Sequence, residues 1–381
     1  MVPYRGTKLK GKNPDQPESV MEKKEKQHGR VGIILVCFLA VLAVTMSAMV
    51  LHVYLSGKNI RQSAAAPNLG ALTLEEQLDE ETGNTQSEQQ SLDVALQDDN
   101  IVLVGGKQYR FNDEVQTFLL LGIDSYSPSN TNGGCNVYAF SDVVILAAFD
   151  FRNNRISLIA ISRDTMCEFQ RLNPDGTDRD YAYGQLALSF SYGDGRAKSC
   201  EITKNAVSQI MSGLPITSCS ALYLHGLQNL NDAVGGVTVT ILEDLNYGYR
   251  DMQKGAEVTL NGSMAEQYIR RREHTDQGNL KRMERQKQYM KALLKKIMET
   301  VKKDPESVLE IYNSIKDEVV TDLTTGEILY LATAAAGMTI SSEIQSVPGQ
   351  IELSEDNFAQ YYIDESGLLN LLLSIYYIEC E

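Results

Sequence analysis

The feature that most constrains this chain is a run of 25 residues, residues 31–55, without Lys, Arg, Asp or Glu. A helix of that length rises roughly 37 Å, which exceeds the ~30 Å thickness of a hydrocarbon core. The run is apolar on every side, unlike a core helix with one apolar stripe, and it exceeds the ~7–15 apolar residues of a signal peptide. We therefore predict one transmembrane helix, with cleavage near Ala64-Ala65-Ala66 as the alternative.

Basic residues are concentrated before this run. Residues 1–30 hold eight Lys and Arg against four acidic residues, whereas Lys58 and Arg61 follow the run closely. Because positive charge stays on the cytoplasmic side, the sequence predicts a basic cytoplasmic tail over residues 1–30 and an extracellular remainder. The predicted location is the cell membrane, with a single pass and the main domain outside.

The extracellular part divides by composition into a stalk and a folded domain. Residues 56–100 are polar, and residues 62–100 contain no Lys or Arg, which predicts an acidic flexible stalk. Residues 101–381 contain short apolar runs such as VQTFLLLGID, DVVILAAFD and RISLIAISRD, separated from helical segments by turns. Nearly continuous apolar runs indicate strands that are covered on both faces. We expect an α/β fold with a single mixed β-sheet flanked by helices on both faces.

Charge and cysteine content narrow the function classes. The chain has 35 Lys and Arg and 50 Asp and Glu, a formal net charge of −15. Nucleic acid is therefore not an expected partner, because phosphate neutralisation needs a basic surface. Six Cys are present, and an extracellular location permits disulfides. Cys200–Cys219 is the favoured pair, although spacing alone does not determine the pairing.

Three acidic residues lie at the ends of the expected strands. Asp124 lies in GIDSY, Asp142 in FSDVVIL, and Asp164 in ISRDT beside Arg163. Each one alone is compatible with a turn cap, but ligands bind at strand ends in α/β sheets, and three such carboxylates favour a site. Mg²⁺ binds one or two carboxylates together with substrate phosphate oxygens, so Mg²⁺ is the predicted cofactor.

A cluster of positive charge interrupts the acidic domain between residues 267 and 287. Its basic residues are Arg270, Arg271, Arg272, Lys281, Arg282, Arg285 and Lys287. Arg282 and Gln286 are four residues apart and share a helix face, with Arg285 beside them. Several guanidinium groups together bind a pyrophosphate well, whereas a solvated basic helix paired with its own Glu residues is the alternative.

Common catalytic motifs are absent from the sequence. It contains no Walker A loop, no G-x-G-x-x-G, no H-E-x-x-H and no G-x-S-x-G. His225 and His274 are the two histidines after the predicted membrane helix, too few for an ordinary zinc site. A catalytic Cys167 would need one of these two histidines beside it, and we do not expect that role. A phosphate-rich ligand at the outer membrane face is therefore best explained as a lipid-linked pyrophosphate.

Five blocks of the sequence, in order, resemble the LytR-CpsA-Psr family of cell-envelope proteins. They are TFLLLGIDS, SDVVILAAFD, SLIAISRDT, AVGGVTVTI and LNGSMAEQYIRRRE with LKRMERQ. The resemblance covers residues 101–381. It implies a membrane-anchored phosphotransferase that moves a glycopolymer, such as teichoic acid or capsule, from a polyprenyl-pyrophosphate carrier to peptidoglycan as a phosphodiester. The implied partners are the polyprenyl-linked glycan, the peptidoglycan acceptor and the cell membrane.

Carried over by position, the resemblance also implies roles for individual residues. Asp124 and Asp142 hold Mg²⁺. Asp142, Arg163 and Asp164 form the catalytic group, in which Asp164 orients Arg163 or helps to activate the acceptor hydroxyl. The implied pyrophosphate-binding residues are Arg163, Arg270, Arg272, Arg282, Arg285 and Gln286. The lipid is expected in an apolar channel lined by helices around residues 206–214 and 222–230.

The sequence departs from the family pattern at positions near the expected site. These positions are Tyr126, Ser162, Gln185 and Asn279, and residues 127–140 form an insertion between two of the carboxylates. The departures keep two alternatives open. One is a non-catalytic envelope protein that binds polyprenyl-linked glycan intermediates, and the other is a polyprenyl-pyrophosphate hydrolase.

Overall fold

The computed structural model describes residues 53, 55–61, 66–69, 94–98, 100–128, 138–245, 252–271 and 278–380. The predicted cytoplasmic tail, nearly all of the predicted membrane helix and most of the predicted stalk lie outside these ranges, and so do Cys135 and Arg272. Residues 55–60 are helical. In the ranges given above, no helix is both long enough and apolar enough to cross a membrane.

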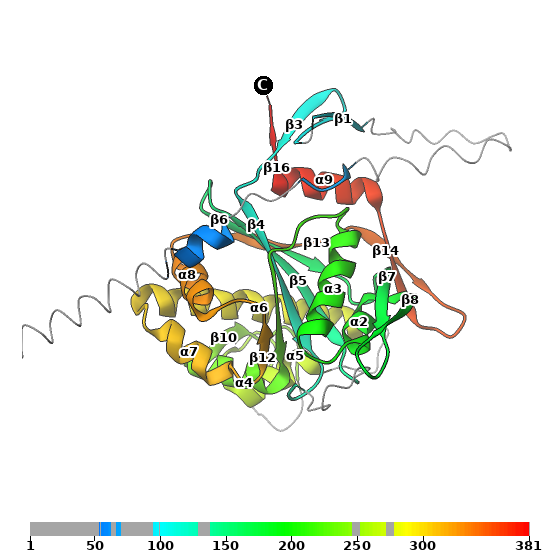
Figure 1. The fold of residues 1–381 in the computed structure, drawn as a ribbon. Helices are drawn as coiled ribbons and strands as arrows, with labels where there is room; N and C mark the ends of the chain where they lie inside the picture. The colour runs from blue at the N-terminus through cyan, green and yellow to red at the C-terminus, as the bar shows by residue number, and fades with distance from the viewer. Residues whose placement is uncertain are drawn as a thin grey trace, which may run out of the picture. The chain divides into compact units, whose positions relative to one another are not determined.

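The centre of the fold is a six-stranded mixed sheet with the order β12-β9-β4-β5-β6-β13 (Figure 1). Its strands are β4 (Val115–Ile123), β5 (Ser141–Asp150), β6 (Arg155–Ile161), β9 (Ser218–Tyr223), β12 (Val319–Thr321) and β13 (Thr339–Ser346). β4 pairs with β9 and β6 with β13 in parallel, whereas the other neighbours are antiparallel. The predicted mixed sheet is therefore confirmed.

The expectation of a single sheet is wrong, because the described residues form four smaller sheets besides the main one. A four-stranded sheet has the order β1-β2-β3-β16, with β1 (Val94–Asp98), β2 (Ile101–Val104), β3 (Lys107–Phe111) and β16 (Tyr377–Glu379). Three antiparallel pairs are β7 (Met166–Leu172) with β8 (Asp178–Gln185), β10 (Val237–Thr240) with β11 (Glu257–Leu260), and β14 (Gly349–Leu353) with β15 (Ala359–Ile363). Strands of such pairs carry one polar face, which weakens the apolar signal in the sequence.

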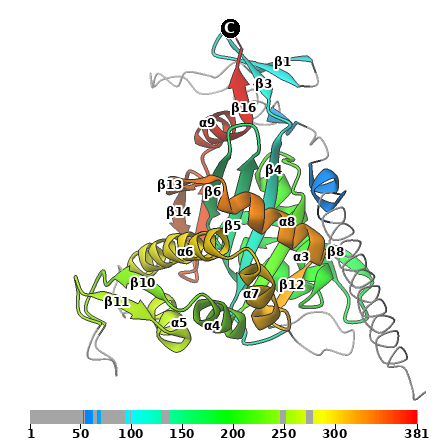
Figure 2. The ribbon, with the colours of Figure 1, turned by 90° about the vertical axis from the view of Figure 1, so that its left-hand side faces the viewer.

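Helices cover both faces of the main sheet, as predicted. One face carries α2 (Leu186–Ser189), the 3₁₀ turn η3 (Phe190–Tyr192) and α3 (Ala197–Ile210). Figure 2 shows the yellow and orange helices in front of the opposite face. The helices on that side are α4 (Leu224–Ala233), α5 (Gly262–Arg270), α6 (Gly278–Lys303), α7 (Ser307–Ile315) and α8 (Thr325–Ala336). Helix α9 (Glu365–Tyr376) packs into the same core as α3.

Local sequence signals explain the helix ends that matter for the site. Asn261 caps α5, since its side chain accepts a hydrogen bond from the Met264 amide. Helix α4 ends at a glycine pair in the left-handed region, with φ of 79° at Gly235 and 86° at Gly236. A Cβ at Gly236 would also lie 3.0 Å from the Leu260 carbonyl oxygen. The Gly pair therefore allows β10 to begin directly under α4.

Candidate functional site

The acidic residues predicted from the sequence meet at one edge of the main sheet. Asp124 directly follows β4, and Asp142 is the second residue of the antiparallel neighbour β5. The backbone amides of both aspartates donate to the same carbonyl oxygen, that of Phe140, at 2.9 and 3.1 Å. Because β6 runs antiparallel to β5, its C-terminal end brings Arg163 and Asp164 to this edge as well.

Arg163 lies between two of these carboxylates. Its Nη1 pairs with Asp142 Oδ1, and its Nε lies 3.6 Å from Asp164 Oδ1. Gln185, the last residue of β8, donates from Nε2 to Asp164 Oδ1 at 3.2 Å and to the Ala359 carbonyl oxygen at 2.6 Å. The predicted catalytic group is therefore contiguous. Gln185 extends this catalytic group, although the sequence identified this residue only as a departure from the family pattern.

A cavity of about 550 Å³ opens at this edge and runs between the sheet and helices α4 and α6. Its polar end is formed by a residue that follows β4 and by residues of β5, α5 and α6, namely Asp124, Asp142, Arg270, Arg282 and Gln286. Its interior is almost entirely apolar. The cavity thus joins five of the predicted site residues, which lie up to 162 positions apart in the sequence, in one wall.

Arg270 lies at the polar end of the cavity and pairs with two acids. Its Nη2 lies 3.2 Å from Asp124 Oδ1, and its Nη1 donates to Glu266 Oε1 at 2.8 Å. Partial burial lowers the pKa of the Arg270 guanidinium, but the hydrogen bonds to Glu266 and Tyr126 and the charge of Asp124 raise that pKa overall. Arg270 is therefore a permanent cation at this end of the cavity.

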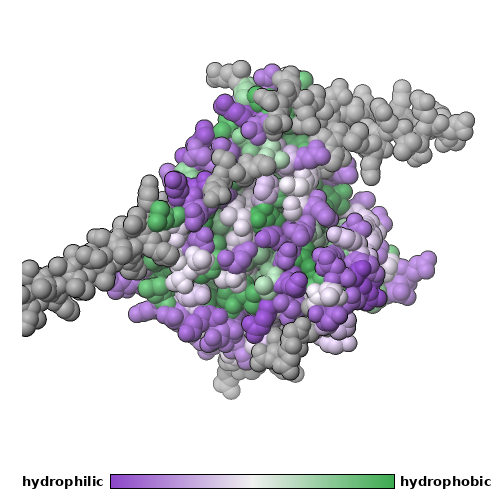
Figure 3. Space-filling model, in the orientation of Figure 1, coloured by the Kyte–Doolittle hydropathy of each residue, from purple (hydrophilic) through white to green (hydrophobic). Residues whose placement is uncertain are grey.

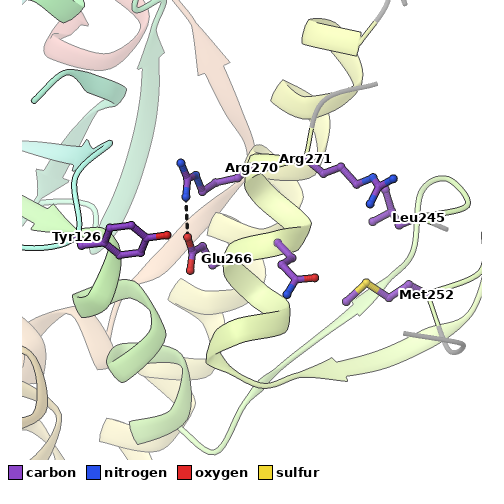
Figure 4. A pocket seen from close by; sticks show the side chains of 7 residues that line it. Tyr126, Leu245, Met252, Glu266, Arg270 and Arg271 are labelled. Atoms are coloured by element: carbon purple, nitrogen blue, oxygen red, sulfur yellow. Dashed lines mark hydrogen bonds and ion pairs between the residues drawn. The ribbon is translucent and has the colours of Figure 1, made fainter. Parts of the chain in front are cut away.

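Arg270 also lines a second pocket of about 570 Å³ beside the C-terminal half of α5. Figure 4 shows that Tyr126, Glu266 and Arg270 point toward one another on one side of α5, while Arg271 points toward Leu245 and Met252. Tyr126 further packs against His225, with ring centroids 4.9 Å apart. Tyr126, one of the residues that depart from the family pattern, thus contacts the site directly.

Arg282 and Gln286 face the cavity from one side of α6, as their four-residue spacing predicts. Arg282 is 9% exposed, so its charge lies within the protein wall. The Gln286 Nε2 donates to the carbonyl oxygen of Ile269 at 3.2 Å. This bond holds the last turn of α5, from which Arg270 projects.

Arg285 does not lie where a pyrophosphate-binding residue, the role implied for it by the resemblance, would be expected. It is 1% exposed and does not line the cavity. Its Nε donates to the Tyr268 carbonyl oxygen at 2.7 Å, its Nη2 to the Arg271 carbonyl oxygen, and its Nη1 pairs with Glu243. The guanidinium therefore binds the carbonyl groups at the C-terminal end of α5, which no helical amide satisfies.

Helix α5 is also fixed to α4, and this fixes the position of Arg270. The Gly262 amide donates to Asp232 Oδ1 at 2.7 Å, and Gln228 Nε2 bonds Glu266 Oε2. A Cβ at Gly262 would lie 2.6 Å from the Gln228 carbonyl oxygen, so only glycine allows this approach of the two helices. Both ends of α5 are thus held by side chains of neighbouring helices.

Only one of the two helical segments predicted to line the apolar part of the cavity does so. Residues 222–230 contribute as expected, through Leu222, Leu224, Leu227 and Leu230. The helix around residues 206–214 packs instead into the core on the opposite face of the sheet, so its predicted role in the channel is wrong. Helix α6 supplies the other wall. Its lining side chains are Tyr289, Met290, Leu293, Leu294 and Ile297.

A smaller apolar cavity of about 170 Å³ adjoins the first one under α6 and α8. The two share Leu120, Ser220, Leu294 and Ile297 in their linings. The smaller cavity adds Met298 and Val301 along α6. Apolar space therefore continues along this helix for several turns beyond the polar end.

The described cysteines are not part of the site. Cys167, Cys200, Cys219 and Cys380 are free thiols, so the favoured disulfide is not formed in the structure. The hydrogen bond that the Cys219 thiol donates to Cys200, together with burial, raises the pKa of Cys219, which shows that the two thiols are neighbours. Burial raises the pKa of the Cys167 thiol to about 12, in agreement with its exclusion as a nucleophile.

The donor set at the polar end suits a hard divalent cation. Asp124 and Asp142 offer carboxylate oxygens from neighbouring strands in one cavity wall. Among the described residues, no group of three or more His, Cys, Asp or Glu side chains is placed to hold a metal ion by protein ligands alone. Two carboxylates are a number of protein ligands that Mg²⁺ commonly takes, with phosphate oxygens and water completing its coordination.

The fold and this site define the class of protein. A mixed α/β sheet with aspartates and arginines at the mouth of an apolar cavity agrees with the resemblance found in the sequence. The LytR_cpsA_psr family model matches residues 71–372. The chain therefore belongs to the LytR_cpsA_psr family.

Individual relatives are similar to most of the chain. The polyisoprenyl-teichoic acid–peptidoglycan teichoic acid transferase TagU of Bacillus cereus is 25% identical over 259 residues, which are 68% of this chain and 77% of that protein. TagU of Oceanobacillus iheyensis is 27% identical and covers 69% of this chain and 75% of its own length. The crystal structure of Bacillus subtilis TagV aligns with a TM-score of 0.51 at 22% identity, over 69% of this chain and 97% of TagV, which shows a shared fold.

Proposed function

We propose that this protein is a membrane-anchored phosphotransferase that attaches a glycopolymer from a polyprenyl-pyrophosphate carrier to peptidoglycan. The observation that carries the proposal is one cavity with carboxylates and guanidinium groups at its mouth and an apolar interior. A polyprenyl pyrophosphate has the same two parts, a charged head and a long hydrocarbon tail. The names of the TagU relatives, teichoic acid transferases acting on a polyisoprenyl-linked polymer, support the same reaction class.

In this proposal the pyrophosphate binds between α5 and α6. Arg270 approaches it from the solvent side and Arg282 from within the wall, and both line the cavity mouth. Guanidinium groups bind phosphate oxygens through two parallel N–H bonds, which fixes orientation as well as charge. Gln286 and Arg285 hold the C-terminal turn of α5 and act as positioning residues.

Mg²⁺ is the proposed cofactor, held by Asp124 and Asp142 together with phosphate oxygens of the substrate. When bound, it supplies positive charge that stabilises the charge on the transferring phosphoryl group. Asp124 is paired with Arg270, and Asp142 with Arg163, so each carboxylate lies beside a guanidinium of the site. Metal and phosphate binding are therefore expected to depend on each other.

The transfer forms one phosphorus–oxygen bond and breaks another. A hydroxyl oxygen of the acceptor sugar attacks the phosphorus attached to the glycan, the bridging oxygen–phosphorus bond breaks, and polyprenyl monophosphate leaves. Asp164 accepts the hydroxyl proton or orients Arg163, whose Nε lies 3.6 Å from it. Arg163 and Arg270 then stabilise charge on the phosphoryl oxygens. The apolar interior retains the leaving lipid.

The direct test uses the full-length chain in detergent with a prenyl-pyrophosphate disaccharide, Mg²⁺ and purified peptidoglycan. We expect disaccharide to become covalently attached to peptidoglycan, with release of one polyprenyl monophosphate per transfer. Normal binding of the prenyl-pyrophosphate disaccharide without any transfer would contradict the proposal and favour a binding protein. Release of saccharide phosphate into water, with none on peptidoglycan, would instead assign a hydrolase.

A further inference from the structure

The outer face of the β7–β8 hairpin is an exposed aromatic surface beside the proposed site. The inner face packs into the core through Cys167, Phe169 and Leu172 of β7, which are 7%, 3% and 2% exposed. On the outer face, Tyr181 and Tyr183 of β8 are 60% and 66% exposed. Side chains alternate along a strand, so both tyrosines lie on the side that faces away from the core.

These tyrosines are not required to build the hairpin. The inner side chains already bury it against the core, and the outer positions of a half-buried strand are usually polar. Tyrosine does favour strands, but Thr and Val serve that preference as well. Two large aromatic rings kept in water on one face are therefore better explained by a ligand that covers them.

The same face leads directly into the proposed catalytic group. Tyr181, Tyr183 and Gln185 are spaced two positions apart, so they form one row along β8. Gln185 ends the row and donates to Asp164 Oδ1 at 3.2 Å. A strand rises about 3.4 Å per residue, so the row extends roughly 14 Å outward from Gln185 to Tyr181. The aromatic surface is thus continuous with the site.

Polar side chains accompany the row. Cross-strand pairing places Glu168 opposite Tyr183 and Gln170 opposite Tyr181. Burial of part of its ring and the nearby Tyr362 phenol raise the pKa of Tyr183, so its hydroxyl stays neutral and able to donate a hydrogen bond. Aromatic rings with hydrogen-bonding groups between them fit a ligand with alternating C–H faces and hydroxyl edges, as in a sugar chain.

The neighbouring β14–β15 hairpin forms a second side of this surface. The Tyr361 amide donates to the Asp164 carbonyl oxygen at 2.8 Å, and Thr165 forms a parallel bridge with Tyr361. Figure 1 shows the orange-red hairpin containing β14 next to β7 and β8. Tyr362, whose phenol is close to Tyr183, belongs to the same strand β15.

Charge selects among possible ligands of this surface. Residues 166–185 carry four acids against two arginines, a net charge of −2. In Figure 3, most of the visible face of the molecule is purple or pale, with hydrophobic residues in small patches. An anionic lipid surface or a phosphate-rich polymer would be repelled by the acidic hairpin, whereas a sugar backbone without phosphate would not.

We propose that the row Tyr181–Tyr183–Gln185 binds the acceptor, a glycan strand of peptidoglycan, and presents its hydroxyl to Asp164. This inference rests on the proposed function and identifies the acceptor side of the same site. The donor occupies the other end, because Arg270 and Arg282 lie at the mouth of the lipid cavity. Sugar rings stack on the two tyrosines, and Glu168 and Gln170 bond their hydroxyls. The row sets acceptor affinity and does not contribute to donor binding.

The test compares full-length variants in detergent, with a soluble peptidoglycan glycan-strand oligosaccharide as the probe. We expect the Tyr181→Ala/Tyr183→Ala double variant to weaken oligosaccharide binding by at least about tenfold and to raise the acceptor KM for transfer similarly. Binding of a prenyl-pyrophosphate disaccharide should remain within about twofold of wild type. The Tyr181→Phe/Tyr183→Phe variant keeps the rings and should retain most of the oligosaccharide affinity.

A matched control is available on the neighbouring hairpin. Ile351 and Leu353 are 57% and 67% exposed and pair with Tyr361 and Ala359, on the face of the hairpin opposite to that of Tyr362. The Ile351→Ala/Leu353→Ala variant removes comparable exposed apolar surface and should bind the oligosaccharide like wild type.

The outcomes separate this inference from the proposed function. Unchanged oligosaccharide affinity in the double alanine variant, with donor binding intact, would overturn the tyrosine surface while leaving the transferase in place. An equal loss in the Ile351→Ala/Leu353→Ala control would also overturn it, because the effect would then be unspecific. If wild type transfers nothing to peptidoglycan, the proposed function fails, and the oligosaccharide measurement still decides whether this face binds glycan.

Discussion

The two faces of the central sheet are packed very differently, although the same strands build both. On β4, Leu119 is 0% exposed and belongs to the dense core under α3. Leu120, the next residue along the strand, lies against the cavity under α4 and α6. One face is filled to stabilise the fold, and the other leaves space open to the charged edge. The proposed lipid and pyrophosphate sites therefore lie on the side of α4, α5 and α6.

The largest effect is expected at the charged edge. The Asp142→Asn variant keeps the shape of the side chain but removes one proposed metal ligand and the charge that pairs with Arg163. We expect transfer to peptidoglycan to fall by about 10²–10³-fold, with the free energy of unfolding nearly unchanged. The control is Glu299→Gln, an exposed carboxylate on α6 far along the helix from this edge. Transfer near the wild-type rate in the Asp142→Asn variant would show that Asp142 is not needed for the transfer reaction.

Two neighbouring leucines on β4 test whether the two faces of the sheet are packed differently. Leu119→Ala should lower the free energy of unfolding by about 2–5 kcal/mol, because it opens a void in a filled core. Leu120→Ala should cost about 1 kcal/mol or less, since its side chain already borders a cavity and loses fewer contacts. Chemical denaturation of both variants measures this difference. Equal costs would mean that the two faces are packed alike.

Filling the cavity should change how the binding affinity depends on the length of the lipid chain, with little effect on the stability of the fold. Leu293→Phe adds a ring to the apolar wall of α6. We expect binding of a long polyprenyl pyrophosphate to weaken by about tenfold, whereas a short prenyl pyrophosphate should bind almost as before. Titration of wild type and variant with both lipids gives the comparison. The same loss for both chain lengths would place the lipid outside this cavity.

A smaller effect is expected from the residue that holds α5. Gln286→Ala removes the hydrogen bond to the Ile269 carbonyl oxygen and loosens the turn that carries Arg270. We expect about a threefold to tenfold weaker affinity for a prenyl pyrophosphate, because one neutral hydrogen bond is lost while Arg270 and Arg282 remain. Isothermal titration measures the affinity, with Lys295→Ala, an exposed residue further along α6, as the control. A loss as large as that of Arg270→Ala would assign Gln286 direct contact with phosphate.

Much of the fold followed from apolar patterns. The runs that became β4, β5 and β6 were visible because both faces of these strands are covered. Helix α8 (Thr325–Ala336) begins at a capping box formed by Thr324 and Glu327, a start signal that is local to the sequence. The β7–β8 hairpin was missed, because β8 has the sequence DRDYAYGQ, in which only Ala182 and Gly184 face the core side. Its alternation is too weak to be recognised without the partner strand.

The site was predictable in type but not in detail. Asp124, Asp142 and Asp164 were found from their places at strand ends, and the structure brings them to one edge of the sheet. Arg285 could not be separated from Arg282 by sequence, because helical spacing puts both near one face. The difference lies in the unsatisfied carbonyl groups of α5, which Arg285 binds. The different positions of Arg282 and Arg285 result from the packing of α5 against α6, which no local sequence pattern predicts.

The central claim is that one cavity holds both the pyrophosphate and the polyprenyl chain. A crystal structure of the full chain, or of a variant without transfer activity, with a prenyl pyrophosphate bound tests it most directly. We expect diphosphate oxygens within hydrogen-bonding distance of Arg270 and Arg282, and the hydrocarbon chain between Leu227 and Met290. A diphosphate bound elsewhere on the protein, with this cavity empty of lipid, would contradict the account.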